Sequence, residues 1–246
     1  MDLGIAGRRA AVGAASTGLG YGAAEALVAE GVRVAICSRD EARIREAAER
    51  LGNGVVPIVA DLSNTDGATG FVRDAERALG GVDILVANAG GPPPGSVDST
   101  DLDAYRAALE LSMLSTVALC RQAVPAMRER GWGRVVAITS SGVRQPIRFL
   151  AGSSAARAAV TSYLKILATE AAPDGVTVNS VQPGLHATDR IRALGNLEQA
   201  ARSVPAGFVG DAGDFGKVVA FLCSEPARFI TGTGVLVDGG ACVGLL

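Results

Sequence analysis

Short β-branched segments alternate with longer segments of helical periodicity along this chain, and that alternation limits the possible folds more than any other feature. Several of the short segments are almost continuously apolar, which is typical of parallel strands that helices cover on both faces. The alternation therefore predicts a doubly wound α/β fold around a parallel sheet. The predicted strands lie at residues 9–12, 32–37, 55–60, 82–87, 134–139, 176–181 and 234–237.

The predicted helices lie at residues 19–30, 41–51, 65–79, 102–130, 153–171 and 211–224. The connections between them are short, and no Pro- or Ser-rich linker, charge block or internal repeat divides the chain. We therefore expect one domain, residues 1–246, with about seven strands. The Gly-Pro-Pro-Pro-Gly run at residues 91–95 predicts a rigid turn. Residues 189–208, which follow a strand, are a candidate lid.

Composition and charge exclude several classes of protein. The chain has 23 Lys and Arg against 25 Asp and Glu, and 4% aromatic residues, so it has neither the basic surface nor the stacking residues of a nucleic-acid binder. Its four cysteines lie far apart with no Cys-x-x-Cys pair, which disfavours a zinc site or a disulfide framework. No apolar run reaches the roughly 18 residues of a membrane helix, and no leader is evident. We expect a cytoplasmic protein with no metal, membrane or nucleic-acid partner.

A glycine-rich turn follows the first predicted strand and opens the first predicted helix. Gly18 and Gly20 allow the backbone to approach a pyrophosphate, and the helix amino terminus offers unpaired N–H donors. The order of strand, turn and helix favours a dinucleotide site over an ordinary tight turn. The expected cofactor-binding residues in this turn are Gly13, Ser16, Gly18, Leu19 and Gly20.

The ends of the next three strands carry the remaining expected cofactor contacts. Strand two ends at Ser38 and Arg39, where an acidic residue would bind a ribose 2′-hydroxyl but a guanidinium suits a 2′-phosphate. This favours NADP over NAD, although Asp40 weakens the electrostatic argument and Arg39 can also be read as a solvated loop residue. Because ligands of such sheets bind outside the carboxyl ends of the strands, the next turns join the site. They contribute Asp61, Leu62, Asn88, Ala89 and Gly90.

Together with Ser140, Pro183-Gly184, Thr188 and the closing Val-Asp-Gly-Gly at residues 237–240, these motifs resemble the short-chain dehydrogenase/reductase family over essentially the whole chain. The resemblance implies a Rossmann-type fold and hydride transfer between a nicotinamide and a carbonyl or alcohol of a small-molecule substrate. It also implies cofactor contact by Thr188, and a homodimer or homotetramer formed by the two long helices. The family turn begins Thr-Gly, whereas Gly13-Ala14 here adds a methyl group near the cofactor.

The expected catalytic centre departs from the family pattern. The family uses a Tyr-x-x-x-Lys pair and an asparagine, whose positions hold Ser153, Arg157 and Ser112, while the family serine is kept as Ser140. A serine hydroxyl is a far weaker acid than a phenol of pKa ~10, and an arginine stays protonated. Ser153 and Arg157 share one helix face, so with Ser140 they are expected to stabilise an oxyanion electrostatically.

Three functions remain open from the sequence. The first is an atypical NADP-dependent oxidoreductase that uses Ser140, Ser153 and Arg157. The second is a non-catalytic partner subunit of the same fold, and the third is an isomerase or cyclase that uses the enlarged pocket. His186, the sole histidine, is either a replacement acid or a pocket-lining residue. Arg144 and Arg148 suggest an anionic substrate, although surface arginines are more common, and the sequence does not name the substrate.

Overall fold

A computed structural model describes residues 1–192 and 197–244, and its centre is one parallel sheet of seven strands. Their order, β3-β2-β1-β4-β5-β6-β7, reverses direction between β1 and β4 and confirms the predicted doubly wound fold. Ligands of open α/β sheets bind at such a reversal. The strands are β1 Arg9–Val12, β2 Arg33–Ser38, β3 Val56–Val59, β4 Ile84–Ala87, β5 Gly133–Ile138, β6 Val176–Pro183 and β7 Gly234–Val237.

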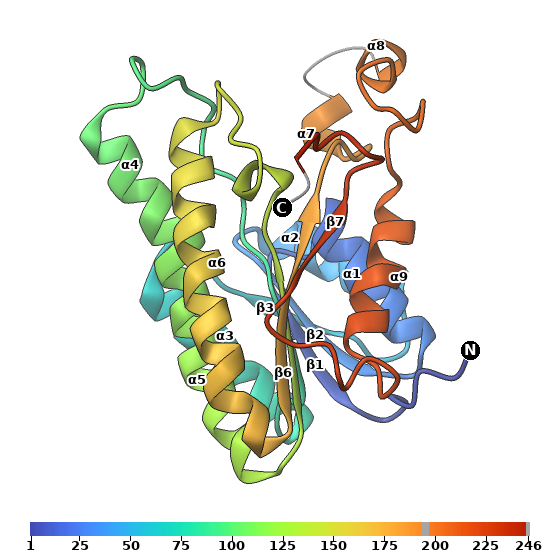
Figure 1. Cartoon of the computed structure of the whole chain (residues 1–246). Helices are drawn as coiled ribbons and strands as arrows, with labels where there is room; N and C mark the ends of the chain where they lie inside the picture. Colours follow the sequence, from blue (N-terminus) through green and yellow to red (C-terminus); the bar gives the residue numbers. More distant parts are fainter. Residues whose placement is uncertain (193–196, 245–246) are drawn as a thin grey trace.

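Helices cover both faces of the sheet (Figure 1). Helices α1, α2 and α9 pack on one face, where Leu27, Ile44 and Phe215 are fully buried. Helices α3, α5 and α6 pack on the other, where Phe71 and Leu119 are buried. The helices are α1 Gly18–Ala29, α2 Glu41–Leu51, α3 Thr65–Leu79, α4 Leu102–Leu109, α5 Ser115–Glu129, α6 Ala151–Ala171, α7 Asp189–Arg192, α8 Leu197–Ala201 and α9 Ala212–Leu222.

The helix expected at residues 102–130 is interrupted. A π-helical segment, η1 Glu110–Leu114, separates α4 from α5. Two hydroxyls donate back to carbonyls of this segment, Ser115 Oγ to Leu111 at 2.6 Å and Thr116 Oγ1 to Ser112 at 3.0 Å. Such side-chain donors compete with the backbone ladder and bend helices, which hydrophobic periodicity does not reveal. The expectation of one regular helix was therefore wrong at its centre.

Helices α1 and α9 cross at two glycines. A Cβ atom on Gly216 would lie 2.0 Å from the carbonyl oxygen of Gly22, and one on Gly22 would lie 2.0 Å from that of Ala212. The two backbones therefore approach more closely than any side chain permits. This contact fixes α1, whose amino terminus faces the carboxyl ends of the strands, against the helix that follows the candidate lid.

Candidate active site and cofactor crevice

The glycine-rich turn is held to the end of β4 by Asn88. Its side-chain Nδ2 donates to the carbonyl oxygens of Gly13 at 3.0 Å and Ala14 at 3.3 Å, and Gly13 N donates to Val86 O at 3.1 Å. A Cβ on Gly13 would lie 2.4 Å from the carbonyl oxygen of Asn88, so the site tolerates only glycine. Two strand ends that are far apart in sequence are thus held side by side.

The amino terminus of α1 is open to a ligand. Its N-cap residue Thr17 makes no side-chain capping bond, whereas α2, α3, α4 and α9 are each capped by an Asp or Asn side chain. Gly18 has a φ of 63°, and a Cβ there would lie 3.4 Å from Cγ2 of Thr188. The turn and the Thr188 loop therefore face each other across the uncapped helix end. Unpaired N–H groups at a helix amino terminus suit a pyrophosphate, so these residues fit a dinucleotide.

Ala14 occupies a backbone conformation that favours glycine. Its φ is 46°, and only Asn53 shares a positive φ among the described non-glycine residues. The left-handed region costs an L-residue roughly 1–2 kcal/mol. The sequence identified the extra methyl of Ala14, and the structure adds that the cofactor turn carries backbone strain at this residue.

Arg39 and Asp61 face each other at the ends of β2 and β3. Arg39 Nε lies 4.0 Å from Asp61 Oδ1, and the Arg39 side chain is 75% exposed. The Asp40 carboxylate is engaged elsewhere, because it caps α2 by accepting from Arg43 N at 3.0 Å. Ser38 Oγ donates to Asp40 O at 2.9 Å. Leu62 is buried under the glycine turn, where a Cβ on Gly13 would meet its Cδ1 at 2.9 Å.

Ser140 follows β5, and Arg157 reaches the last residue of the same strand from α6. Ser140 Oγ accepts a hydrogen bond from Gly142 N at 3.0 Å, which leaves the hydroxyl hydrogen to donate. Arg157 Nη1 donates to Ile138 O at 2.7 Å. Helix α6 therefore places the guanidinium at a backbone carbonyl that precedes Ser140 by two residues. Ser153 lies one turn earlier on α6 and is half-buried.

Two further polar side chains lie on α6 and η1, one missed by the sequence analysis and one expected from it. Ser154, which the sequence analysis missed, accepts a hydrogen bond from Ile147 N at 3.3 Å and anchors the loop before α6. Only its adjacency to Ser153 could have signalled it. Ser112 lies in η1, and its buried Oγ has no hydrogen-bond partner within the described part of the chain. Segments of π-helix often occur at functional sites.

His186 is not placed as a replacement acid. It is 4% exposed, its ring meets Phe215 edge-on at 5.1 Å between centroids, and its Nδ1 lies 3.2 Å from Gly184 O. Burial lowers the pKa of its ring, against smaller opposing effects of the Gly184 carbonyl and Asp211. His186 therefore packs the base of the candidate lid.

The candidate lid is closed at its base by backbone hydrogen bonds. Gly210 N donates to Leu185 O at 3.0 Å, and Ala187 N donates to Gly210 O at 2.8 Å. Helices α7 and α8 lie within this segment, whereas residues 193–196 lie outside the described residues.

Arg144 is not available to contact an anionic substrate, as the sequence suggested, because its guanidinium is engaged within the protein. It donates to Gln182 Oε1 at 2.8 Å and to Gly234 O at 2.9 Å.

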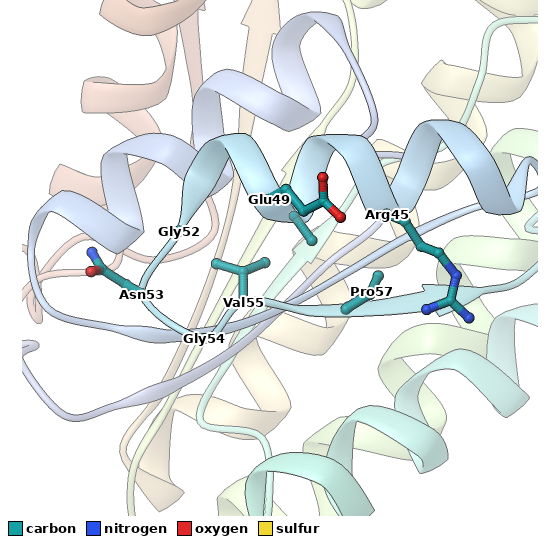
Figure 2. A pocket seen from close by; sticks show the side chains of 8 residues that line it. Arg45, Glu49, Gly52, Asn53, Gly54, Val55 and Pro57 are labelled. Atoms are coloured by element: carbon teal, nitrogen blue, oxygen red, sulfur yellow. The ribbon is translucent and has the colours of Figure 1, made fainter.

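A second hollow lies away from the crevice (Figure 2). It has a volume of about 330 Å³ and lies between α2 and the start of the edge strand β3. Arg45 and Glu49 come from the helix, and Val55 and Pro57 come from the strand side. Because it adjoins the amino end of β3, it is separate from the predicted site.

The described residues offer neither a metal site nor a membrane-spanning helix. Among them, no three His, Cys, Asp or Glu side chains are grouped so that they could hold a metal ion. None of the helices within residues 1–192 and 197–244 is long and apolar enough to cross a membrane. The four cysteines are free thiols, and burial raises the pKa of Cys37, Cys120 and Cys223 to about 12.

Comparison with known proteins decides the family. The family model described as enoyl-(acyl carrier protein) reductase matches residues 13–242. The chain belongs to the short-chain dehydrogenase/reductase family. Members of this family are NAD(P)-dependent oxidoreductases that act on small carbonyl and alcohol substrates.

Individual relatives match over nearly their full length. L-fucose dehydrogenase of Bos taurus is 33% identical over 99% of this chain and 93% of its own length. The 3-oxoacyl-(acyl-carrier-protein) reductase of Salmonella typhimurium is 32% identical over 95% of this chain and 97% of its own. The L-sorbose reductase of Gluconobacter frateurii, solved with NADPH and L-sorbose, is 30% identical with a TM-score of 0.93 and full coverage of both chains.

Proposed function

We propose that this short-chain dehydrogenase/reductase is an NADP-dependent oxidoreductase of a small carbonyl or alcohol, with Ser140, Ser153 and Arg157 in place of an acid–base pair. The observation that carries the proposal is the Arg157 hydrogen bond to Ile138 O at 2.7 Å. It holds a permanent positive charge at the end of β5, two residues before Ser140 in the sequence. The same strand ends include the uncapped glycine turn that fits a dinucleotide.

The cofactor contacts in this proposal come from four strand ends. The α1 amino terminus, with Gly18, Leu19 and Gly20, would hold the pyrophosphate, opposite Thr188. Arg39 would bind the 2′-phosphate, and the relative solved with NADPH supports the choice of NADP. The remaining proposed contacts are Gly13, Ser16, Ser38, Asp61, Leu62, Asn88, Ala89 and Gly90.

Each catalytic side chain has a separate part in the proposed reaction. When bound, the nicotinamide supplies or accepts the hydride. Ser140 donates a hydrogen bond from its hydroxyl to the substrate oxygen. Arg157 stabilises the negative charge that develops on that oxygen. Ser153 adds a hydroxyl donor but does not ionise near neutral pH, so water delivers the proton to the product. Loss of a general acid costs about 10²–10⁴-fold in rate, which predicts a slow enzyme.

Calorimetric titration with NADPH and NADH tests the cofactor part of the proposal. We expect NADPH to bind more tightly, and Arg39→Asp to erase or reverse that preference because it replaces a phosphate partner with a repelling charge. Equal affinities of the parent protein for the two cofactors would contradict the role of Arg39. Binding of neither would favour the non-catalytic alternative.

The double variant Ser153→Tyr with Arg157→Lys separates a reductase from the isomerase or cyclase alternative. It restores a phenol and an ammonium at i and i+4 on the same face of α6. If the crevice is that of a reductase, the variant reduces activated ketones faster than the parent. Unchanged or absent reduction with NADPH still bound would count for a non-redox reaction in the enlarged pocket.

We also propose that the chain forms a homo-oligomer through α5 and α6. Part of the apolar stripe expected to face a second copy is internal instead, because Thr116, Cys120 and Val160 are buried in the chain's own core. Leu109 at the end of α4, Leu114 in η1 and Ile166 on α6 remain exposed. Light scattering at micromolar concentration should show a dimer or tetramer, and a monomer would contradict this proposal.

A further inference from the structure

We propose that Asp61 limits the preference of this protein for NADP, because its carboxylate competes with the 2′-phosphate for Arg39. This inference rests on the proposed NADP function and assigns Asp61 a specificity role beyond contact with the cofactor. Membership of the family does not by itself give Asp61 this role. The role depends on Arg39, which this chain carries at the end of β2.

The Asp61 carboxylate is fixed in place toward Arg39. Ser63 N donates to Asp61 Oδ1 at 2.9 Å, and the same oxygen lies 4.0 Å from Arg39 Nε. Backbone pairing brings the two strand ends together, since Ala60 N donates to Ser38 O at 3.0 Å. An anchored carboxylate therefore faces an arginine whose side chain is 75% exposed.

Arg39 has no second carboxylate among its contacts in the described residues. Asp40, its sequence neighbour, caps α2 through Arg43 N. The Asp61 contact is the ion pair that a 2′-phosphate would have to share or displace. A phosphate near Asp61 would also be repelled by the carboxylate, and both effects weaken binding of the 2′-phosphate specifically.

Exposed ion pairs contribute little, so the expected effect is moderate. A contribution in the upper part of the usual range for such pairs corresponds to about a threefold to fivefold change in affinity. An adenine contact by Asp61 would instead affect ligands with and without a 2′-phosphate equally. The ratio of the two affinities therefore isolates the proposed competition from any contact with the adenine ring.

The test is calorimetric titration of the full-length protein with adenosine 2′,5′-bisphosphate and with adenosine 5′-monophosphate. We expect Asp61→Asn, which keeps the oxygen that accepts from Ser63, to raise the affinity ratio of bisphosphate to monophosphate about threefold to fivefold. The increase should shrink at high salt, because the interactions are exposed. In the Arg39→Met background the same substitution should change the ratio by less than about twofold. Without Arg39, Asp61 can weaken binding only by repelling the 2′-phosphate.

Asp40→Asn is the matched control. It removes an equal charge beside Arg39 in sequence but keeps the capping oxygen, and should leave the ratio nearly unchanged. An equal increase in the Asp40 and Asp61 variants would overturn the specific role of Asp61, as would an unchanged or lower ratio in Asp61→Asn. The two proposals fail in different ways: equal affinities of the parent for the two ligands, unchanged in Asp61→Asn, would contradict the role of Arg39, whereas a parent that prefers the bisphosphate but shows the same ratio in Asp61→Asn would overturn only the competition by Asp61.

Discussion

Arg157 on α6 donates from Nη1 to the carbonyl oxygen of Ile138, the last residue of β5, at 2.7 Å. This bond connects the helix that carries Ser153 to the strand that leads into Ser140. A lysine at this position would place a single point charge there, whereas the planar guanidinium has several donors in a fixed arrangement. The arginine therefore holds α6 to β5, and in the proposed reaction it would also supply the positive charge.

Removing this charge is expected to slow the proposed reaction strongly. Arg157→Met and Ser140→Ala should each lower kcat by about 10²–10³-fold, the usual cost of losing one oxyanion donor. Ser153→Ala should cost less than tenfold, because serine is a poor acid and water can replace it. Steady-state NADPH oxidation measures these effects. Arg73→Met, on the exposed face of α3, is the control and should match the parent.

Ala14→Gly should stabilise the protein. Glycine adopts the φ of 46° without the strain that alanine carries, so the free energy of unfolding should rise by about 1 kcal/mol. Ala15→Gly is the matched control: Ala15 is fully buried and has no positive φ, so that variant should lose stability. Urea unfolding of both variants checks the prediction, and a less stable Ala14→Gly variant would contradict the strain at this residue.

Gly216→Ala should destabilise the packing of α1 against α9. The added Cβ would lie 2.0 Å from the carbonyl oxygen of Gly22, so the helices must separate, at a cost of about 3 kcal/mol. Gly70→Ala is the control in α3, where only the Arg73 guanidinium lies near the added atom, at 3.7 Å. That variant should gain about 0.5–1 kcal/mol from helix propensity. Thermal unfolding distinguishes the two, and equal shifts would refute the tight crossing.

Asp83 should make stability depend on acid pH. Burial raises the pKa of its carboxyl, but hydrogen bonds from Arg9 at 2.6 and 2.7 Å and the charges of Arg9 and Arg130 outweigh burial and hold that pKa below its usual range. The contribution to stability is complete above the ordinary pKa of about 3.9 and is lost as pH falls through the lower folded pKa.

Asp83→Asn is expected to remove this dependence and to cost about 3 kcal/mol at neutral pH, since it leaves Arg9 without its charged partner. Urea unfolding at neutral pH and below pH ~4 measures both effects. The difference in stability between parent and variant should narrow as the pH falls. A difference that stays constant with pH would show that Asp83 does not titrate as described.

The fold was predictable from the sequence because the strands and helices have distinct periodicities. Every predicted strand appears, and the helix at residues 41–51 has the predicted bounds. The π-helical segment around Ser112 was not predictable, because it depends on hydroxyl-to-carbonyl bonds and not on hydrophobic spacing. The helix predicted from Ser153 begins at Ala151, two residues earlier.

The candidate site was predictable in part. The strand ends could be grouped because parallel strands end at the same edge of a sheet. The burial of His186 against Phe215 depends on a contact between segments far apart in sequence, and so does the pairing of Arg144 with Gln182. The ion pair of Arg39 with Asp61 likewise needed the positions of two strand ends.

The most direct test of the central claim is a single-turnover reaction of the parent protein with NADPH that carries deuterium at the transferring position of the nicotinamide. The protein is mixed with a panel of activated ketones, and the products are analysed by mass spectrometry. We predict slow formation of an alcohol that contains the deuterium, and a rate about 10²–10³-fold lower in Arg157→Met. Saturating NADPH binding with no deuterium in any product would contradict the assignment as an oxidoreductase.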